Sequence, residues 1–153
     1  MIIYIIIASV VILTIAILFF IHSKKIKVFN KYIDIDISLD FNENTNLKTK
    51  GRYGLVLFKI NEIRRESRAL YIEKVSISNS KIHLRTYNNI YTKLPIPKEG
   101  ITLSVGVRKS KRLSSREINN CRITLSGFLM DDNNHKLPFK KKLPIYKVND
   151  SVD

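Results

Sequence analysis

Residues 1–21 form an uninterrupted apolar run whose only polar side chains are Tyr4, Ser9 and Thr14. A helix rises about 1.5 Å per residue, so this run would span roughly 31 Å, close to the bilayer hydrocarbon thickness of about 30 Å. Tyr4 suits the membrane interface, and the Ser9 and Thr14 hydroxyls can donate to helix carbonyls. The run therefore predicts a single transmembrane helix.

A cleaved secretory signal is the competing interpretation of the same run. However, no Lys or Arg precedes it, and it is longer than the apolar core of ~7–15 residues that is typical of signal peptides. The segment Phe19–His22 lacks the small residues of a cleavage site, and no Cys directly follows it to accept a lipid. We therefore expect an uncleaved signal anchor.

Beyond Tyr32, apolar and polar positions alternate with a period of two. Between Ile33 and Phe41, for example, every second residue is apolar, which is typical of a strand with one buried and one solvated face. Comparable patterns predict seven strands, over residues 33–41, 53–60, 70–78, 82–87, 101–107, 121–130 and 136–146. The strand over 53–60 is apolar on both faces, so it is expected at the centre of a sheet, between two layers.

The residues between these strands predict two hairpins. One would join the third and fourth strands across Asn79–Lys81, and the other would join the last two strands around Asp131–Asn134. Residues 61–68 are expected to form a helical turn or a wide loop. Pro138 and Pro144 remove donors from the final strand, which is therefore expected at the edge of a sheet.

Seven short strands without a helical period predict a mainly β fold, an antiparallel β-sandwich behind the transmembrane helix. In general architecture the pattern resembles immunoglobulin-like and fibronectin-like sandwiches, although the Cys…Trp…Cys signature is absent because the chain has no Trp and one Cys. A partly open barrel is the alternative. The predicted organisation is a transmembrane anchor over 1–21, a basic juxtamembrane linker over 22–31, a β-sandwich domain over 32–147 and a polar tail over 148–153.

Charge separates the two parts of the chain. Its 27 Lys and Arg outnumber 13 Asp and Glu, for a net charge of +14, and no charged side chain precedes His22. Cys121 is the single cysteine, which excludes an intrachain disulfide and a zinc site built on several cysteines. A lone thiol is also compatible with a reducing compartment.

Four lysines follow the apolar run closely: Lys24, Lys25, Lys27 and Lys31. Lys and Arg near the end of a membrane helix are retained on the cytoplasmic side. We therefore expect the domain in the cytoplasm, with an extracytoplasmic domain as the alternative.

The remaining basic residues form three clusters that are candidates for a contact surface. They are Arg64, Arg65, Arg68, Arg108, Lys109, Lys111, Arg112, Arg116, Lys140, Lys141 and Lys142. Basic groups contribute about 1 kcal/mol each near an anionic bilayer, within a Debye length of ~8 Å. A membrane surface is favoured over nucleic acid, because no strand carries the clustered aromatics of an RNA-binding sheet and the bilayer is already at hand.

Chemistry-bearing residues give weaker signals. Asp34, Asp36 and Asp40 share one strand face and could hold a cation with Asp131 and Asp132, but the spacing of a calcium loop is absent. A solvated face paired with the surplus of Lys and Arg is the preferred interpretation.

No motif indicates catalysis. The three histidines, His22, His83 and His135, are far apart in sequence, and no nucleophile elbow or phosphate-binding loop is present. We therefore predict no catalytic, cofactor or metal residue and no enzyme. A pocket that holds His83 or Cys121 beside a carboxylate would instead favour an enzyme.

These observations predict a single-pass, membrane-anchored binding module that presents a basic surface next to the bilayer. Its expected partners are the membrane lipids and a protein of unknown identity. The alternative function is an extracytoplasmic module of the cell envelope or of adhesion, with the same anchor.

Overall fold

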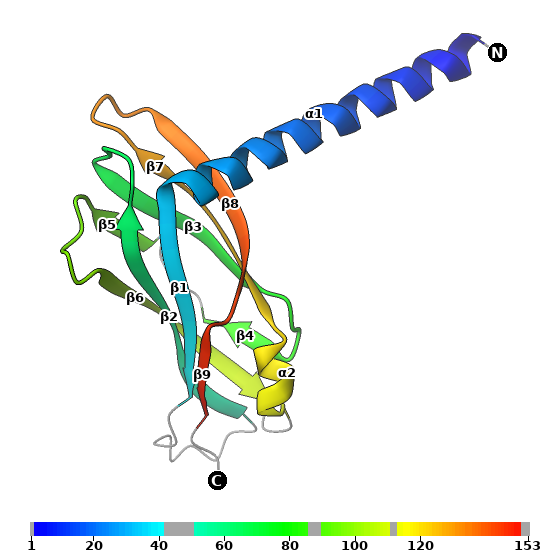
Figure 1. Cartoon of the computed structure of the whole chain (residues 1–153). Coiled ribbons are helices and arrows are strands. Elements are labelled where there is room, and N and C mark those ends of the chain that lie inside the picture. The colour runs from blue at the N-terminus through cyan, green and yellow to red at the C-terminus, as the bar shows by residue number, and fades with distance from the viewer. Residues whose placement is uncertain (1, 42–50, 86–89, 111–112, 151–153) are drawn as a thin grey trace.

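The computed structural model describes residues 2–41, 51–85, 90–110 and 113–150, and these form two helices and nine strands (Figure 1). The elements are, in order, α1 Ile2–Tyr32, β1 Ile33–Phe41, β2 Gly51–Ile63, β3 Ala69–Ile77, β4 Ile82–Leu84, β5 Ile90–Lys93, β6 Ile101–Ser110, α2 Ser115–Asn119, β7 Arg122–Met130, β8 Lys136–Pro144 and β9 Lys147–Asp150.

The strands form two sheets with the core between them. One sheet has the order β4-β6-β2-β1-β9, and the other has the order β5-β3-β7-β8. Neighbouring strands are antiparallel except β1 and β9, which are parallel. The predicted mainly β sandwich behind an apolar helix is confirmed, whereas its immunoglobulin-like or fibronectin-like type stays a prediction.

The alternating patterns place side chains as expected in β1 and only partly in β2. In β1, every second residue from Ile33 to Phe41 is buried. β2 is the central strand of its sheet, as predicted, but only one of its faces lies in the core. Val56 and Phe58 are fully buried, whereas Leu55 is 43% exposed, because none of the described residues forms a third layer over the outer face. The expectation that this strand lies between two layers was wrong.

One of the two predicted hairpins is present. β7 and β8 pair along their whole length around the turn at Asp131–Asn134, and β8 is an edge strand, as predicted. The prediction of a hairpin across Asn79–Lys81 was wrong. There the chain crosses between the sheets, since β3 pairs with β5 and β7 while β4 pairs with β6. Alternation shows which side chains point inward but not which sheet a strand joins.

The segments expected to be irregular are more ordered than the sequence suggested. β2 continues to Ile63, so part of residues 61–68 extends a strand. At the other end of the domain, the Tyr146 N–H donates to the Ile37 carbonyl (2.7 Å) and the chain continues into β9 beside β1. Residues 148–150, predicted as a polar tail, therefore belong to the sandwich.

α1 continues without a break to Tyr32, through the residues predicted as a linker. Phe29 is 3% exposed and its ring centroid lies 5.7 Å from that of Phe139 on β8. α1 contacts β8 of one sheet and β1 of the other, and the Arg64 N–H donates to the Tyr32 carbonyl (2.9 Å). The last turns of α1 thus close one side of the sandwich.

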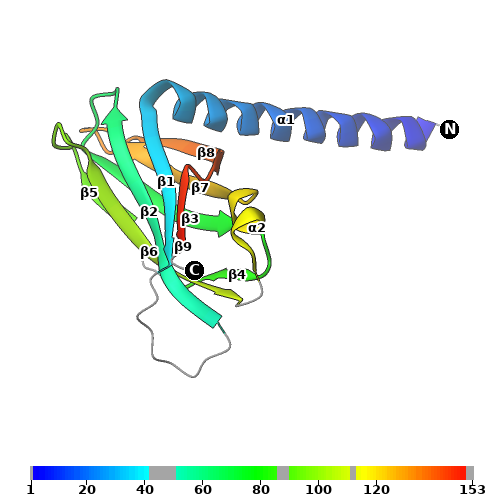
Figure 2. The ribbon, with the colours of Figure 1, turned by 60° about the horizontal axis from the view of Figure 1, so that its bottom comes forward.

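The rest of α1 projects away from the domain, as Figures 1 and 2 show. Its side chains are exposed, and the Ser9 and Thr14 hydroxyls donate to the carbonyls of Ile5 and Val10 (2.8 Å each). The helix is long and apolar enough to cross a membrane, a property of membrane spans and signal sequences alike.

We predict that Phe29→Ala destabilises the β domain, because it removes a ring that joins α1 to the core. The expected loss in the free energy of unfolding is about 3–5 kcal/mol, the usual range for a buried Phe, and Phe29→Leu should lose less. Thermal unfolding of the full chain in detergent, followed by tyrosine near-ultraviolet circular dichroism, measures it. Phe19→Ala is the matched control, since Phe19 is 73% exposed on the same helix. Equal melting of the two alanine variants would contradict the packing of α1 on the domain.

Candidate functional site

The first hollow lies where α1 rests on the sandwich and has a volume of about 390 Å³. We call it the helix groove. It is lined by Ile21, Lys24, Lys25, Lys27, Val28, Lys31, Tyr32, Arg65, Leu137 and Pro138. Four of its members are the predicted membrane-proximal lysines, and a fifth comes from the arginine cluster after β2.

Helical spacing explains how one short segment supplies both the contact with the core and the charge. Residues three or four positions apart share a face of a helix, so Lys24, Val28 and Lys31 form one stripe while Lys25 lies above Phe29 on the side that meets the sheets. Lys25 is accordingly half-buried, whereas Lys24 and Lys31 are exposed.

Aromatic rings hold several of these cations in place. The Lys24 Nζ lies 4.5 Å from the centroid of the Phe20 ring. The Lys31 Nζ and the Arg65 guanidinium carbon lie 5.0 and 5.4 Å from the centroid of the Tyr32 ring. Such contacts are favourable and leave the remaining donors of each cation available to an anion.

A second hollow, the sheet groove, lies on the outer face of the four-stranded sheet and has a volume of about 430 Å³. Its lining is polar and basic: Lys25, Glu73, Lys74, Ser76, Thr124, Ser126, Gly127, Pro138, Phe139 and Lys140. Lys25 was predicted as a membrane-proximal lysine and Lys140 as a residue of the contact surface, whereas Lys74 and the three hydroxyls were not predicted. They come from β3 and β7, and no local signal indicates that these two strands pair.

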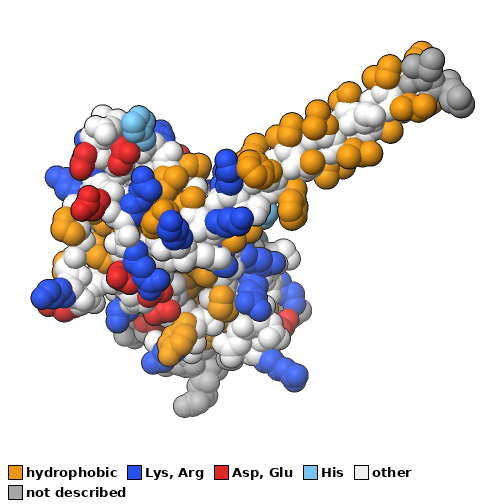
Figure 3. All heavy atoms as spheres, turned by 45° about the horizontal axis from the view of Figure 1, so that its top comes forward, with side chains coloured by type: hydrophobic (Ala, Val, Ile, Leu, Met, Phe, Trp, Pro, Cys, Tyr) orange, Lys and Arg blue, Asp and Glu red, His pale blue; other side chains and the backbone are white. Residues whose placement is uncertain are grey.

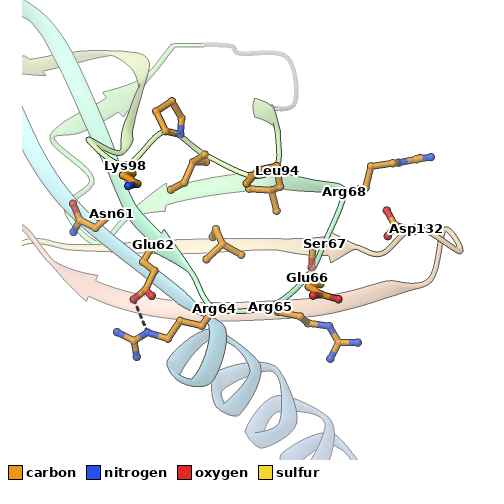
Figure 4. A pocket seen from close by; sticks show the side chains of 14 residues that line it. Asn61, Glu62, Arg64, Arg65, Glu66, Ser67, Arg68, Leu94, Lys98 and Asp132 are labelled. Atoms are coloured by element: carbon orange, nitrogen blue, oxygen red, sulfur yellow. Dashed lines mark hydrogen bonds and ion pairs between the residues drawn. The ribbon is translucent and has the colours of Figure 1, made fainter.

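The third hollow, of about 800 Å³, lies between the β2–β3 and β5–β6 connections (Figure 4). The predicted cluster Arg64, Arg65 and Arg68 lines it, but the three side chains diverge: Arg64 and Arg65 project on the side of α1, and Arg68 projects beside Asp132. Glu66 contributes a further negative charge. The hollow therefore carries both signs of charge rather than a basic patch.

Two of these arginines are engaged within the protein. The Arg64 Nε donates to the Glu62 carboxylate (2.7 Å), which raises the pKa of Arg64 further above its ordinary value. The Arg68 guanidinium donates to the Asn134 side-chain oxygen (2.8 Å) in the β7–β8 turn.

Lys109 was predicted on the contact surface, and this was wrong. It is 2% exposed, and its Nζ lies 4.7 Å from the centroid of the Phe41 ring. It follows Val105 and Val107 at the inward positions of β6, so strand periodicity places it in the core.

The other predicted basic residues are scattered. Arg108 lies on the outer face of β6 near the Tyr53 ring, and Arg116 is exposed on α2. On β8, Lys140 and Lys142 are exposed and Lys141 is half-buried. Lys111 and Arg112 lie outside the described residues.

An aromatic row crosses the outer face of the four-stranded sheet. Tyr91, Tyr71 and Phe128 are direct neighbours on β5, β3 and β7, with ring centroids 4.8 and 4.7 Å apart. The Lys136 Nζ lies 4.5 Å from the centroid of the Phe128 ring. The stacked Tyr71 and Phe128 rings cover each other's faces, which a stacked nucleic-acid base would need, whereas Tyr91 is 44% exposed.

The candidate acidic and nucleophilic residues either lie apart from one another or form hydrogen bonds within the domain. Asp34 and Asp36 are exposed, and Asp36 accepts from the Asn61 side-chain amide (2.9 Å). Asp131 accepts from the His135 backbone N–H (2.8 Å), which is the main cause of its lowered pKa. Among the described residues, no group of three or more His, Cys, Asp or Glu side chains could hold a metal ion.

Cys121 and His83 lie apart from each other. The Cys121 thiol is buried beside α2 and donates to the Glu117 carbonyl (3.2 Å), and burial raises its pKa. His83 is exposed on β4 opposite Arg108. Neither residue forms a nucleophile–base pair with the other.

Comparisons with protein families, with curated proteins and with solved structures found no match to this chain. A β-sandwich carried by one long apolar helix, with a lysine-rich junction between them, is compatible with a membrane-anchored module.

We predict that the capping box of α2 makes the stability of the domain depend on pH. Glu117 accepts from the Ser114 N–H (3.0 Å) and pairs with Lys81 (3.3 Å), and its pKa is lowered below the ordinary 4.5, chiefly by the Ser114 backbone N–H and hydroxyl and then by Lys81. A lowered carboxyl pKa stabilises the fold above the unfolded-state pKa, and this contribution is lost as pH falls through the folded-state pKa. Glu117→Gln should therefore lower the melting temperature at neutral pH, and the difference from the wild type should shrink below pH 4.5.

The control for this measurement is Glu66→Gln, because the Glu66 carboxylate has no hydrogen bond or ion pair within the described part of the chain. It should leave the melting temperature nearly unchanged. A constant difference between Glu117→Gln and the wild type from neutral to acid pH would contradict the electrostatic explanation.

Proposed function

We propose that this chain is a single-pass, membrane-anchored binding module that holds the lysine-rich side of its β-sandwich against its own bilayer. One observation carries the proposal: the lysine-bearing end of α1 is packed into the domain through Phe29 rather than forming a free linker. The cations next to the membrane thus belong to a rigid surface.

The length of α1 supports this placement. With residues 1–21 in the hydrocarbon, Lys24, Lys25 and Lys27 would lie roughly 5–9 Å beyond it, within the layer of lipid headgroups. Basic groups at this depth are worth about 1 kcal/mol each against an anionic surface. Figure 3 shows that Lys and Arg side chains gather where the helix leaves the sandwich.

The direction of α1 supports it as well. In Figures 1 and 2, α1 projects toward the same side of the sandwich as α2, so this side would face the membrane. Arg116 on α2 is exposed there and would add to the attraction. The opposite side would remain available to a protein partner, whose local concentration the tether raises.

We propose that this module is not an enzyme and that the domain lies in the cytoplasm. The dispersion of the candidate nucleophiles and carboxylates supports the first point. The four lysines after an uncharged run of residues support the second. A domain outside the cytoplasm, as in a cell-envelope or adhesion module, is the competing outcome of the test below.

The predicted effect of replacing Lys24, Lys25, Lys27 and Lys31 with Gln is a change of topology. Without these retained charges, part of the population should insert with the domain exported. A reporter fused to the C-terminus of the full chain, together with protease access in intact and permeabilised cells, measures the fractions.

The matched control replaces four exposed lysines distant from α1, Lys59, Lys93, Lys98 and Lys147, with Gln. It removes the same charge and should leave the topology unchanged. If the wild-type reporter is already outside, the envelope-module alternative holds. If the juxtamembrane variant inserts like the wild type, the four lysines are only a solvated flank.

A further inference from the structure

The helix groove and the sheet groove adjoin each other. Lys25 and Pro138 line both of them, so the two hollows meet where α1 rests on β8. The helix groove has an apolar floor that includes Val28, Leu137 and Pro138, whereas the sheet groove is lined by lysines and hydroxyls. We call these two adjoining hollows, one partly apolar and one polar, the channel; it lies beside the end of the apolar run of α1.

Strand register arranges the polar half of this channel in rows. Lys74, Ser126 and Lys140 lie directly opposite one another on β3, β7 and β8. In the next row, Ser76 lies opposite Thr124. Each row crosses adjacent strands, so the Cβ atoms of neighbouring residues in a row are about 5 Å apart. This spacing allows several side chains to contact one small anion.

A β-bulge in β3 brings Lys74 into the groove. The register shifts between Ile72 and Lys74, and Ile72 and Val75 point into the core on either side of the bulge. In a regular strand Lys74 would share the inward face of Ile72. The extra residue, Glu73, turns Lys74 outward, opposite Ser126.

The donors of the sheet groove are unused within the fold. The side chains of Lys25, Lys74, Lys140, Ser76, Thr124 and Ser126 make no hydrogen bond or ion pair to any part of the chain that the structure describes. Against these three ammonium groups stands one carboxylate, Glu73. The groove thus offers cations and hydroxyl donors, the groups that bind phosphate oxygens.

We propose that this channel binds one anionic phospholipid of the bilayer in which α1 sits, with the phosphate-bearing headgroup in the sheet groove and an acyl segment in the helix groove. The proposal rests on the proposed function in one respect, that α1 spans a membrane. Two features favour a lipid over a soluble phosphate. A phosphate ion would leave the apolar residues of the helix groove without a partner. Ile21, the last residue of the apolar run, also lines the helix groove, so this end of the groove would lie beside the hydrocarbon.

The test uses the full chain purified in detergent, with native mass spectrometry to count bound lipids. Phosphatidylglycerol is the anionic probe, and phosphatidylcholine with the same acyl chains is the neutral one. One phosphatidylglycerol should bind per chain, in preference to phosphatidylcholine. Lys74→Gln combined with Lys140→Gln should lower the affinity for phosphatidylglycerol about 30-fold, roughly fivefold for each lysine, and change the binding of phosphatidylcholine little.

Two further variants separate the parts of the site. Lys59→Gln combined with Lys93→Gln removes the same charge from exposed positions outside the channel and should leave the affinity unchanged. Leu137→Asn should weaken the binding of both lipids, because it disturbs the apolar floor rather than the headgroup contacts. Thermal unfolding of each variant verifies that it is folded.

Two outcomes would overturn the proposal. If the groove variant and the charge-matched control weaken binding equally, the attraction is diffuse and no defined site exists. If glycerol 3-phosphate displaces phosphatidylglycerol at equal concentration, the groove binds a soluble phosphate and the acyl segment contributes nothing. Neither outcome changes the topology measured with the reporter, so the failure of this site can be distinguished from the failure of the anchored module.

Discussion

The burial of Phe29 between α1 and Phe139 is the interaction on which the rest of the arrangement depends. A two-layer sandwich leaves its sides open where edge strands meet, and apolar side chains there would contact water. α1 covers one such side by contacting β8 and β1 together. Because the covering helix is also the apolar one, an α1 that spans a membrane as proposed would fix the domain relative to that membrane. Residues of both α1 and β8 line each of the two grooves.

The lysines of β8 have two physical roles that are compatible. β8 is a long edge strand, and exposed edges are protected from pairing with other chains by Lys and Pro. Lys140, Lys142 and the two prolines fit this role. Edge protection does not, however, require a lysine on an inner strand, and Lys74 stands on β3, turned outward by a bulge. The combination of an edge lysine and a re-aimed inner lysine around Ser126 is what suggests a ligand.

Local patterns predicted the elements whose partners are close in sequence. β1 and the β7–β8 hairpin follow from alternation and turn residues alone. The crossing after β3, the parallel pairing of β9 with β1 and the groove between β3 and β7 depend on contacts between distant segments, which periodicity does not encode. Lys109 is different, because continuing the alternation of Val105 and Val107 by one step predicts its burial. Its basic neighbours in the sequence make Lys109 resemble part of an exposed cluster, whereas the alternation of the strand places it in the core. The bulge at Glu73 is the opposite case, because regular alternation from the buried Ile72 would place Lys74 in the core.

Lys25 shows how the anchoring and binding features depend on one another. It lies one helical turn before Phe29 on the face of α1 that meets the sheets, so the packing that buries Phe29 also carries Lys25 to the boundary of both grooves. Since α1 is continuous from the apolar run to Tyr32, a change in bilayer thickness that tilts a membrane-spanning α1 would move the sandwich with it. The helix groove would then change its depth among the headgroups, whereas the distances within the channel would stay fixed by the core. In the proposed arrangement the bilayer would set the access of a lipid to the channel, whereas the packing of α1 on β8 positions Lys25 at its boundary.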